Sequence, residues 1–131
     1  MTLNLATGNS GNDHMTRDSL ADLTVQLRRF ADDRDWQQFH SPKNLAAALI
    51  VEAGELLEHF QWLNEAESEA LSVEKRGEVE LELADVLIYL VRLADRLDVD
   101  LIAAATRKIG INAEKYPVEK SRGSHTKYTG L

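Results

Sequence analysis

The chain has 131 residues, with 22 acidic and 15 basic side chains and a formal net charge of −7. Its length suits one domain with a single core, and its 44% hydrophobic content is typical of a soluble globular protein. The negative charge argues against a nucleic acid polymer as partner, because such binding depends mainly on neutralising phosphates. The apolar runs are too short to span a membrane, and the absence of cysteine excludes disulfides and thiolate metal ligands. Together with a polar start that lacks a signal-peptide pattern, these features favour a cytoplasmic protein.

The beginning of the chain is rich in glycine and asparagine, and we expect residues 1–17 to form a flexible arm. A first helix is predicted over residues 18–34, because Leu20, Leu23 and Leu27 recur at helical spacing. No segment of the chain has a pattern typical of a β-strand. The sequence therefore predicts only helices and connecting segments after the arm.

The connection after this helix is unusually aromatic, since it contains Trp36, Phe39 and His40. Loops held by a rigid scaffold often carry binding residues. This connection is therefore a candidate binding segment, and packing of Trp36 in the core is the alternative.

Two further helices are predicted from their capping residues. The second is expected to begin at Ser41, with Pro42 at the first helical position, and to end near Leu63. After an acidic linker over residues 64–71, a third helix is expected over residues 72–97, with a serine as its N-terminal cap.

The last predicted helix covers residues 100–116, where Pro117 ends it, and residues 118–131 are expected to form an irregular basic tail. Connections of these lengths favour an antiparallel four-helix bundle. The predicted fold class is therefore all-α, with the helical domain over residues 18–117.

Two of these helices carry pairs of carboxylates among apolar residues. Glu52 and Glu55 lie three residues apart in the second helix, so they share one helix face. Glu82 and Asp85 have the same spacing in the third helix. One such pair is usually a surface feature, but helices this apolar have little solvated face. Carboxylates near an interior repel one another and lose hydration, so they would bind either protons or a cation.

The type of ligand atom favours a hard ion. Carboxylate oxygens without any cysteine favour Mg²⁺, or Mn²⁺ as a substitute, over zinc. A charged stripe paired with basic residues is the alternative, although Arg92 and Arg96 lie two to three turns from Asp85. A di-iron site is disfavoured because it would need Glu-x-x-His pairs, whereas Leu56 stands three residues before His59.

The two acidic pairs resemble the metal motif of the all-α nucleotide pyrophosphohydrolase superfamily, which includes MazG, the dimeric dUTPases and the dCTP pyrophosphatases. The resemblance is closer to the dCTP pyrophosphatase branch and covers most of the chain. The segments that carry it, besides the acidic pairs, are Arg34–His40, Phe60–Trp62, Glu82–Leu90, Lys108–Asn112, Lys115–Pro117 and Lys127–Thr129.

This resemblance implies a magnesium-dependent enzyme that hydrolyses a nucleoside triphosphate, dCTP or a modified dCTP, to the monophosphate and pyrophosphate. Water would attack the α-phosphorus, and the assembly would be a homotetramer, a dimer of dimers, with active sites near subunit contacts. The catalytic and metal-binding residues would be Glu52, Glu55, Glu82 and Asp85. The substrate-binding residues would be Trp36, Phe39, His40, Trp62, Tyr89, Lys108 and Asn112.

Two alternatives to dCTP hydrolysis stay open. Leu27 occupies the position of a substrate-site histidine in vertebrate dCTP pyrophosphatases, which leaves room for broad house-cleaning or dUTP-directed hydrolysis. The chain could instead be a non-catalytic helical oligomerisation or regulatory module, since its apolar helices suit subunit contacts. Such a module gives no reason for four acids on apolar helix faces.

Overall fold

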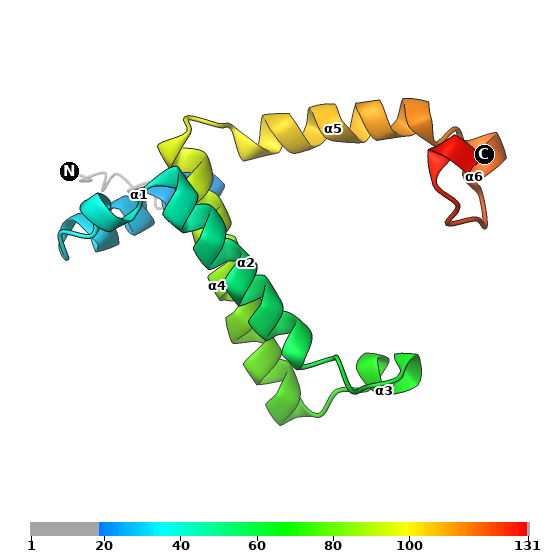
Figure 1. Ribbon diagram of the computed structural model, residues 1–131, viewed down its shortest axis with the longest axis horizontal. Coiled ribbons are helices and arrows are strands. Elements are labelled where there is room, and N and C mark those ends of the chain that lie inside the picture. The colour runs from blue at the N-terminus through cyan, green and yellow to red at the C-terminus, as the bar shows by residue number, and fades with distance from the viewer. Residues whose placement is uncertain (1–18, 131) are drawn as a thin grey trace, which may run out of the picture.

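The computed structural model describes residues 19–130, and every regular element in this range is a helix (Figure 1). In chain order the elements are α1 (Leu20–Asp32), η1 (Gln37–Phe39), α2 (Pro42–Glu58), α3 (Glu65–Glu69), α4 (Val73–Arg96), α5 (Leu101–Lys115), α6 (Val118–Ser121) and η2 (Tyr128–Gly130). The all-α prediction is confirmed for this range. The expected arm over residues 1–17 lies outside the described residues. Over residues 19–130, no helix is both long enough and apolar enough to cross a membrane.

Side-chain caps start the three longest helices where the sequence predicts them. The side-chain oxygens of Ser41, Ser72 and Asp100 each accept a hydrogen bond from the backbone N–H three residues later, at 3.2, 3.1 and 2.9 Å respectively. Each cap satisfies a backbone donor that the first helical turn leaves unpaired. These starts depend on local sequence alone, which is why the sequence predicts them well.

The body of the molecule is an antiparallel pair formed by α2 and α4. The direction follows from two contacts: His40, just before α2, lies 3.4 Å from Arg92 near the end of α4. His59, just after α2, lies 3.5 Å from Glu82 nearer the start of α4. Helix α1 packs on the C-terminal half of α4. The buried hydrophobic residues of this body are Ala31, Leu45, Val79, Val91 and Ala94.

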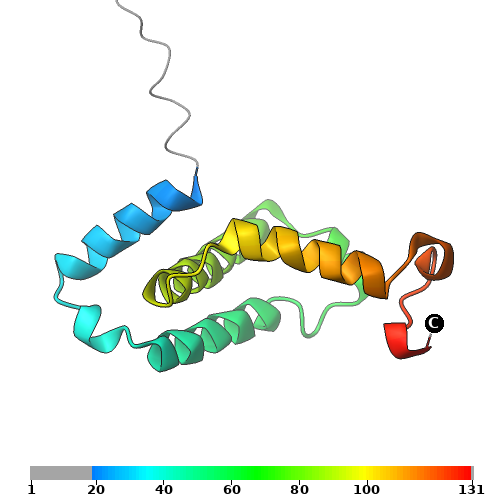
Figure 2. The ribbon, with the colours of Figure 1, turned by 90° about the horizontal axis from the view of Figure 1, so that it is seen from above.

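Helix α5 leaves the end of α4 and extends away from the α2–α4 pair, with α6 and η2 at its far end (Figure 1). The view from above shows α1 and η1 at one end of the long axis and the C-terminal elements at the other (Figure 2). No residue of α5 is buried, and the side chains of Ile102 and Ile109 are 63% and 69% exposed. The single chain thus packs three of the four expected bundle helices together. The complete four-helix bundle is not confirmed for the described residues, because the fourth helix, α5, has no buried residue.

Two shorter segments also differ from the prediction. The acidic linker contains the helix α3, because Asn64 and Glu67 form a reciprocal capping box with two hydrogen bonds of 2.9 Å. The tail expected to be irregular contains α6 and η2, and Tyr128 packs edge-on against Tyr116 with ring centroids 5.9 Å apart. Local capping and one aromatic contact therefore order segments that their composition alone marks as loops.

Candidate metal and nucleotide site

The pairing of α2 with α4 brings three of the four predicted carboxylates together. Glu52, Glu82 and Asp85 each offer an oxygen atom, and these oxygens all lie within 4.8 Å of one another. The reason is geometric: residues three apart share a helix face, and the two faces meet where the helices pack. Two elements far apart in sequence thus form one cluster of hard oxygen donors.

Glu55 borders this cluster without joining its three oxygens. It is exposed on α2, one turn after Glu52, and its negative charge acts on Glu52. The structure therefore places all four predicted acids in one region, with Glu55 on the solvent side.

The electrostatics of the cluster favour a bound cation. Burial raises the pKa of Glu52, and the negative charges of Glu55 and Asp85 raise it further. Within residues 19–130, no lysine or arginine forms an ion pair with Glu52, Glu82 or Asp85. This disfavours the charged-stripe alternative. A carboxylate-only donor set of this kind fits a hard divalent ion such as Mg²⁺.

His59 is a neighbour of the cluster that is not among the site residues predicted from the sequence. Its Nε2 lies 3.5 Å from Glu82 Oε1, and its Nδ1 lies 3.6 Å from Glu78 Oε2. The side chain is only 16% exposed. Its position seven residues after Glu52, two helical turns along the same face, could have predicted this location.

The aromatic candidates lie at both ends of α2 rather than in one place. Trp36 packs against Phe30 with centroids 5.7 Å apart and lies beside His40, with centroids 6.2 Å apart. Trp36 and Phe39 are 42% and 60% exposed, so neither is a core residue. Trp62 is 87% exposed and follows the opposite end of α2. Because α2 has 17 residues, its two ends are separated by about 25 Å.

The remaining candidates divide between the cluster and α5. Tyr89 is half-buried on α4, one turn after Asp85. Lys108 and Asn112 lie on α5, which extends away from α2 and α4 (Figure 1). One chain therefore brings Tyr89 near the carboxylates but does not bring Lys108, Asn112 or Trp62 into the same site as Trp36.

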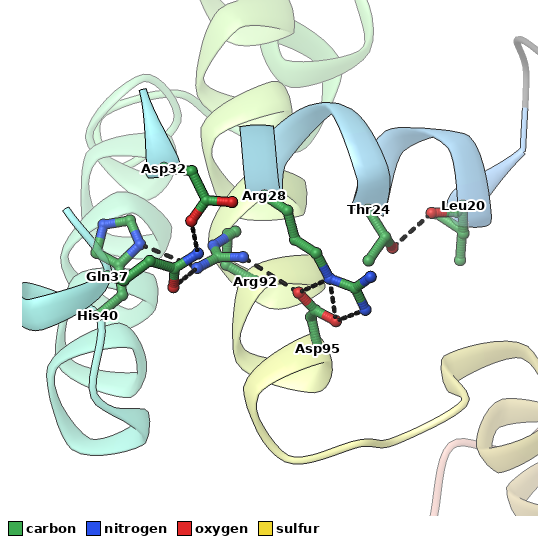
Figure 3. A network of polar contacts seen from close by, with 8 residues as sticks. All are labelled: Leu20, Thr24, Arg28, Asp32, Gln37, His40, Arg92 and Asp95. Carbon is green, nitrogen blue, oxygen red and sulfur yellow. Dashed lines mark hydrogen bonds and ion pairs between the residues drawn. The ribbon is translucent and has the colours of Figure 1, made fainter. Parts of the chain in front are cut away.

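A buried arginine connects the aromatic segment to α4 (Figure 3). The side chain of Arg92 is 3% exposed and donates to Asp95 Oδ2 at 3.1 Å, to Gln37 Oε1 at 2.9 Å and to His40 Nδ1 at 3.4 Å. Asp95 also accepts from Arg28 of α1, with 2.8 Å between Arg28 Nε and Asp95 Oδ2. The partner of Arg92 is therefore Asp95 and not one of the acidic pairs.

This network makes a testable contribution to stability. The hydrogen bond from Arg28, with the positive charges of Arg28 and Arg92, holds the pKa of Asp95 below its usual 3.8. A lowered folded-state pKa stabilises the fold above the unfolded pKa and loses that effect as the pH falls through the folded value. We expect Asp95→Asn to lower the free energy of unfolding at pH 7 by about 3 kcal/mol, because it leaves Arg92 buried without a carboxylate.

Urea unfolding of both proteins from pH 7 down to pH 2 checks this expectation. The difference between wild type and Asp95→Asn should stay constant down to about pH 4 and then shrink, because the wild-type carboxylate becomes protonated. Glu80→Gln removes an exposed acid of the same helix and serves as the control, with little effect expected. A difference that is unchanged down to pH 2 would show that the ionised form of Asp95 is not what stabilises the fold.

Comparison with known proteins agrees with this architecture. A model of the MazG-like family matches residues 48–131. The chain is 49% identical to dCTP pyrophosphatase 1 from Rattus norvegicus and 46% identical to that from Homo sapiens, over 86% of this chain and 68% of each relative. The crystal structure of a pyrophosphatase from Archaeoglobus fulgidus is similar with a TM-score of 0.70 and 42% identity, over 85% of this chain and 99% of that chain. This chain therefore belongs to the MazG-like family.

Proposed function

We propose that this protein is a magnesium-dependent dCTP pyrophosphohydrolase that produces dCMP and pyrophosphate. The observation that carries this proposal is the identity of 46% to 49% with proteins named dCTP pyrophosphatase 1 over most of the chain. The cluster of Glu52, Glu82 and Asp85 supports it, because pyrophosphate-releasing hydrolysis needs positive charge at the triphosphate.

In this mechanism the four carboxylates divide into two roles. Glu52, Glu82 and Asp85 hold the ion, since their oxygens already converge. When bound, magnesium neutralises charge on the phosphates and makes water more acidic. Glu55 accepts the proton of the attacking water, because it is exposed beside the cluster and outside the three converging oxygens. The bond between the α-phosphorus and the oxygen that bridges it to the β-phosphorus breaks, and its electron pair leaves with pyrophosphate.

The nucleoside lies toward the N-terminal end of α2 in this proposal. Trp36 offers an exposed aromatic face for base stacking, which contributes about 1–3 kcal/mol per base. His40 lies beside it with ring centroids 6.2 Å apart, and Phe39 and Tyr89 are proposed as further contacts of the nucleoside. In this proposal one chain supplies half of the binding site, since no lysine or arginine within residues 19–130 forms an ion pair with the metal-binding carboxylates.

A homotetramer, arranged as a dimer of dimers, would supply the missing half. Ile50 on α2, Leu81 on α4 and Ile109 on α5 are 72%, 68% and 69% exposed, far more apolar surface than an isolated chain usually leaves in water. In such an assembly α5 of one copy packs on the α2–α4 pair of another and brings Lys108 and Asn112 to its phosphates. Trp62 reaches the base site of a partner in the same way.

Hydrolysis of a nucleotide panel tests the proposed activity. We expect pyrophosphate release from dCTP with magnesium, none with EDTA, and partial recovery with manganese. In ¹⁸O-labelled water the label should enter dCMP, because water attacks the α-phosphorus. Label in pyrophosphate would contradict attack at the α-phosphorus, and no release from any nucleotide by folded protein would favour the non-catalytic module.

The same panel separates the alternative substrates. Comparing dCTP, a 5-substituted dCTP and dUTP at one concentration gives their relative kcat/KM values. A preference for the substituted nucleotide would indicate a house-cleaning role, and a preference for dUTP would contradict the proposed base.

A further inference from the structure

His40 ends a chain of polar contacts that begins on α1 and passes through η1 and α4 (Figure 3). We propose that Arg92 is a positioning residue that fixes His40 in the tautomer with its proton on Nε2, so that His40 donates a hydrogen bond to an oxygen of the bound base. The second half of this inference rests on the proposed function. The first half concerns the free protein and stands without it.

The direction of the first hydrogen bonds is set at Asp32. An ionised carboxylate only accepts, and Gln37 Nε2 donates to Asp32 Oδ1 at 2.8 Å. This orients the amide of Gln37, so its oxygen faces Arg92 and lies 2.9 Å from Nη2. Both contacts require the same orientation of the Gln37 amide, because Asp32 can only accept a hydrogen bond and Arg92 can only donate one.

Arg92 then determines what His40 can do. A guanidinium only donates, and its Nη2 carries two hydrogens. One is directed to Gln37, and the other faces His40 Nδ1 at 3.4 Å. If Nδ1 were protonated, its hydrogen would point at the hydrogen on Arg92 Nη2 and the two would repel. This nitrogen must therefore be unprotonated and accept the hydrogen bond. In a neutral imidazole the proton is therefore on Nε2.

The surroundings keep this imidazole neutral and the arginine in place. Burial lowers the pKa of His40, and the positive charges of Arg92 and Arg96 lower it further. Arg92 is held on its other side by Asp95, which Arg28 also binds. With 3% of its side chain exposed, Arg92 has little freedom to turn away from His40.

The second ring nitrogen of His40 is the one available to a ligand. It points away from Arg92 and Gln37 (Figure 3), and the ring lies beside the exposed Trp36 with centroids 6.2 Å apart. A base stacked on Trp36 would meet an N–H donor here. Its partner must be an acceptor, and a pyrimidine carbonyl oxygen has the required chemistry.

Nitrogen NMR of the free protein labelled with ¹⁵N-histidine tests the tautomer directly. We expect the neutral Nε2–H form of His40 in the wild type at pH 7, and a mixture of both tautomers in Arg92→Met. Arg96→Met is the matched control: it removes a nearby positive charge without removing the contact to Nδ1, so it should raise the His40 pKa and leave the tautomer unchanged. Arg92→Lys, which keeps a donor, should retain the wild-type form.

Two results would overturn the positioning role. One is a wild-type His40 protonated mainly on Nδ1, which needs no variant and so does not depend on Arg92→Met folding. The other is an unchanged tautomer in folded Arg92→Met. Neither outcome depends on whether the protein hydrolyses dCTP.

Kinetics with dCTP test the donated hydrogen bond. We expect His40→Ala and Arg92→Met each to raise KM about tenfold with little change in kcat, the usual scale of one binding hydrogen bond. The double variant should be no worse than either single variant, because both remove the same interaction. If the effects of the two substitutions on KM were additive, or if KM were unchanged in His40→Ala, the proposed hydrogen bond to the base would be overturned. The tautomer measured by NMR would not be affected by that outcome.

Discussion

Glu82→Gln is expected to reduce pyrophosphate release from dCTP by about a thousandfold while leaving a folded helical protein. The substitution keeps the shape of the side chain but removes one of three converging negative charges. A magnesium ion bound by the remaining carboxylates would be held weakly and out of place. Steady-state rates over a range of magnesium concentrations, with circular dichroism to check helix content, measure this effect.

Although Glu82→Gln is expected to lose activity, the same substitution should increase the stability of the protein when no metal is present. Because burial and neighbouring charges already raise the pKa of Glu52, removing a negative charge from the cluster relieves repulsion. We expect metal-free Glu82→Gln to unfold at a higher temperature than metal-free wild type. Added magnesium should raise the unfolding temperature of the wild type much more than that of Glu82→Gln.

Glu80→Gln, which changes an exposed acid of the same helix, is the control for both measurements. It should leave the rate and the magnesium-dependent stabilisation unchanged. Equal stabilisation of the wild type and Glu82→Gln by magnesium would place the ion elsewhere and remove the structural basis of the proposed mechanism.

Mixed oligomers of two inactive variants are expected to regain activity. Glu82→Gln lacks a metal ligand, and Lys108→Ala lacks the proposed phosphate contact from α5. If α5 acts on another copy, a hybrid assembly contains sites with an intact Glu82 from one chain and an intact Lys108 from its neighbour. With random mixing, about a quarter of all sites should be intact. The reason is that α5 cannot serve the carboxylates of its own chain while it extends away from them (Figure 1).

Co-expression of the two variants, followed by purification of the hybrid and measurement of dCTP hydrolysis, checks this expectation. Each variant alone, and a simple mixture without subunit exchange, should stay inactive. The double variant co-expressed with Glu82→Gln is a further control, because it adds no intact Glu82. A hybrid without activity would show that Lys108 acts within its own chain or has no part in the reaction.

The helix positions were largely predictable because they depend on neighbouring residues. Ser41, Ser72 and Asp100 cap the helices that the sequence assigns to them, since a cap is completed within three residues. The capping box of Asn64 and Glu67 is equally local, so the sequence pattern is sufficient to predict it. The segment is nevertheless predicted above as a linker.

The candidate site was predictable only in part. Glu52 and Glu82 are predictable as site residues because charged side chains among apolar residues usually bind a partner or an ion. The structure brings them together with Asp85. His59 is not predicted as a site residue, although its spacing of seven residues from Glu52 is consistent with its position beside Glu82. The sequence argues against Arg92 as a partner of the acidic pairs but does not identify its actual partner, Asp95, because sequence distance does not tell which carboxylate a buried guanidinium contacts.

The sequence by itself determined the all-helical character, the start of each long helix and the two acidic pairs. These depend on capping, hydrophobic spacing and residues three apart on one helix face, all of which act within a few residues. Only the tertiary structure decided that the two pairs meet, that Arg92 joins Asp95 to His40, and that α5 extends away from α2 and α4. The physical reason is that these relations depend on packing between segments far apart in the chain. Such packing is governed by the shape and burial of whole helix faces, which no local pattern encodes.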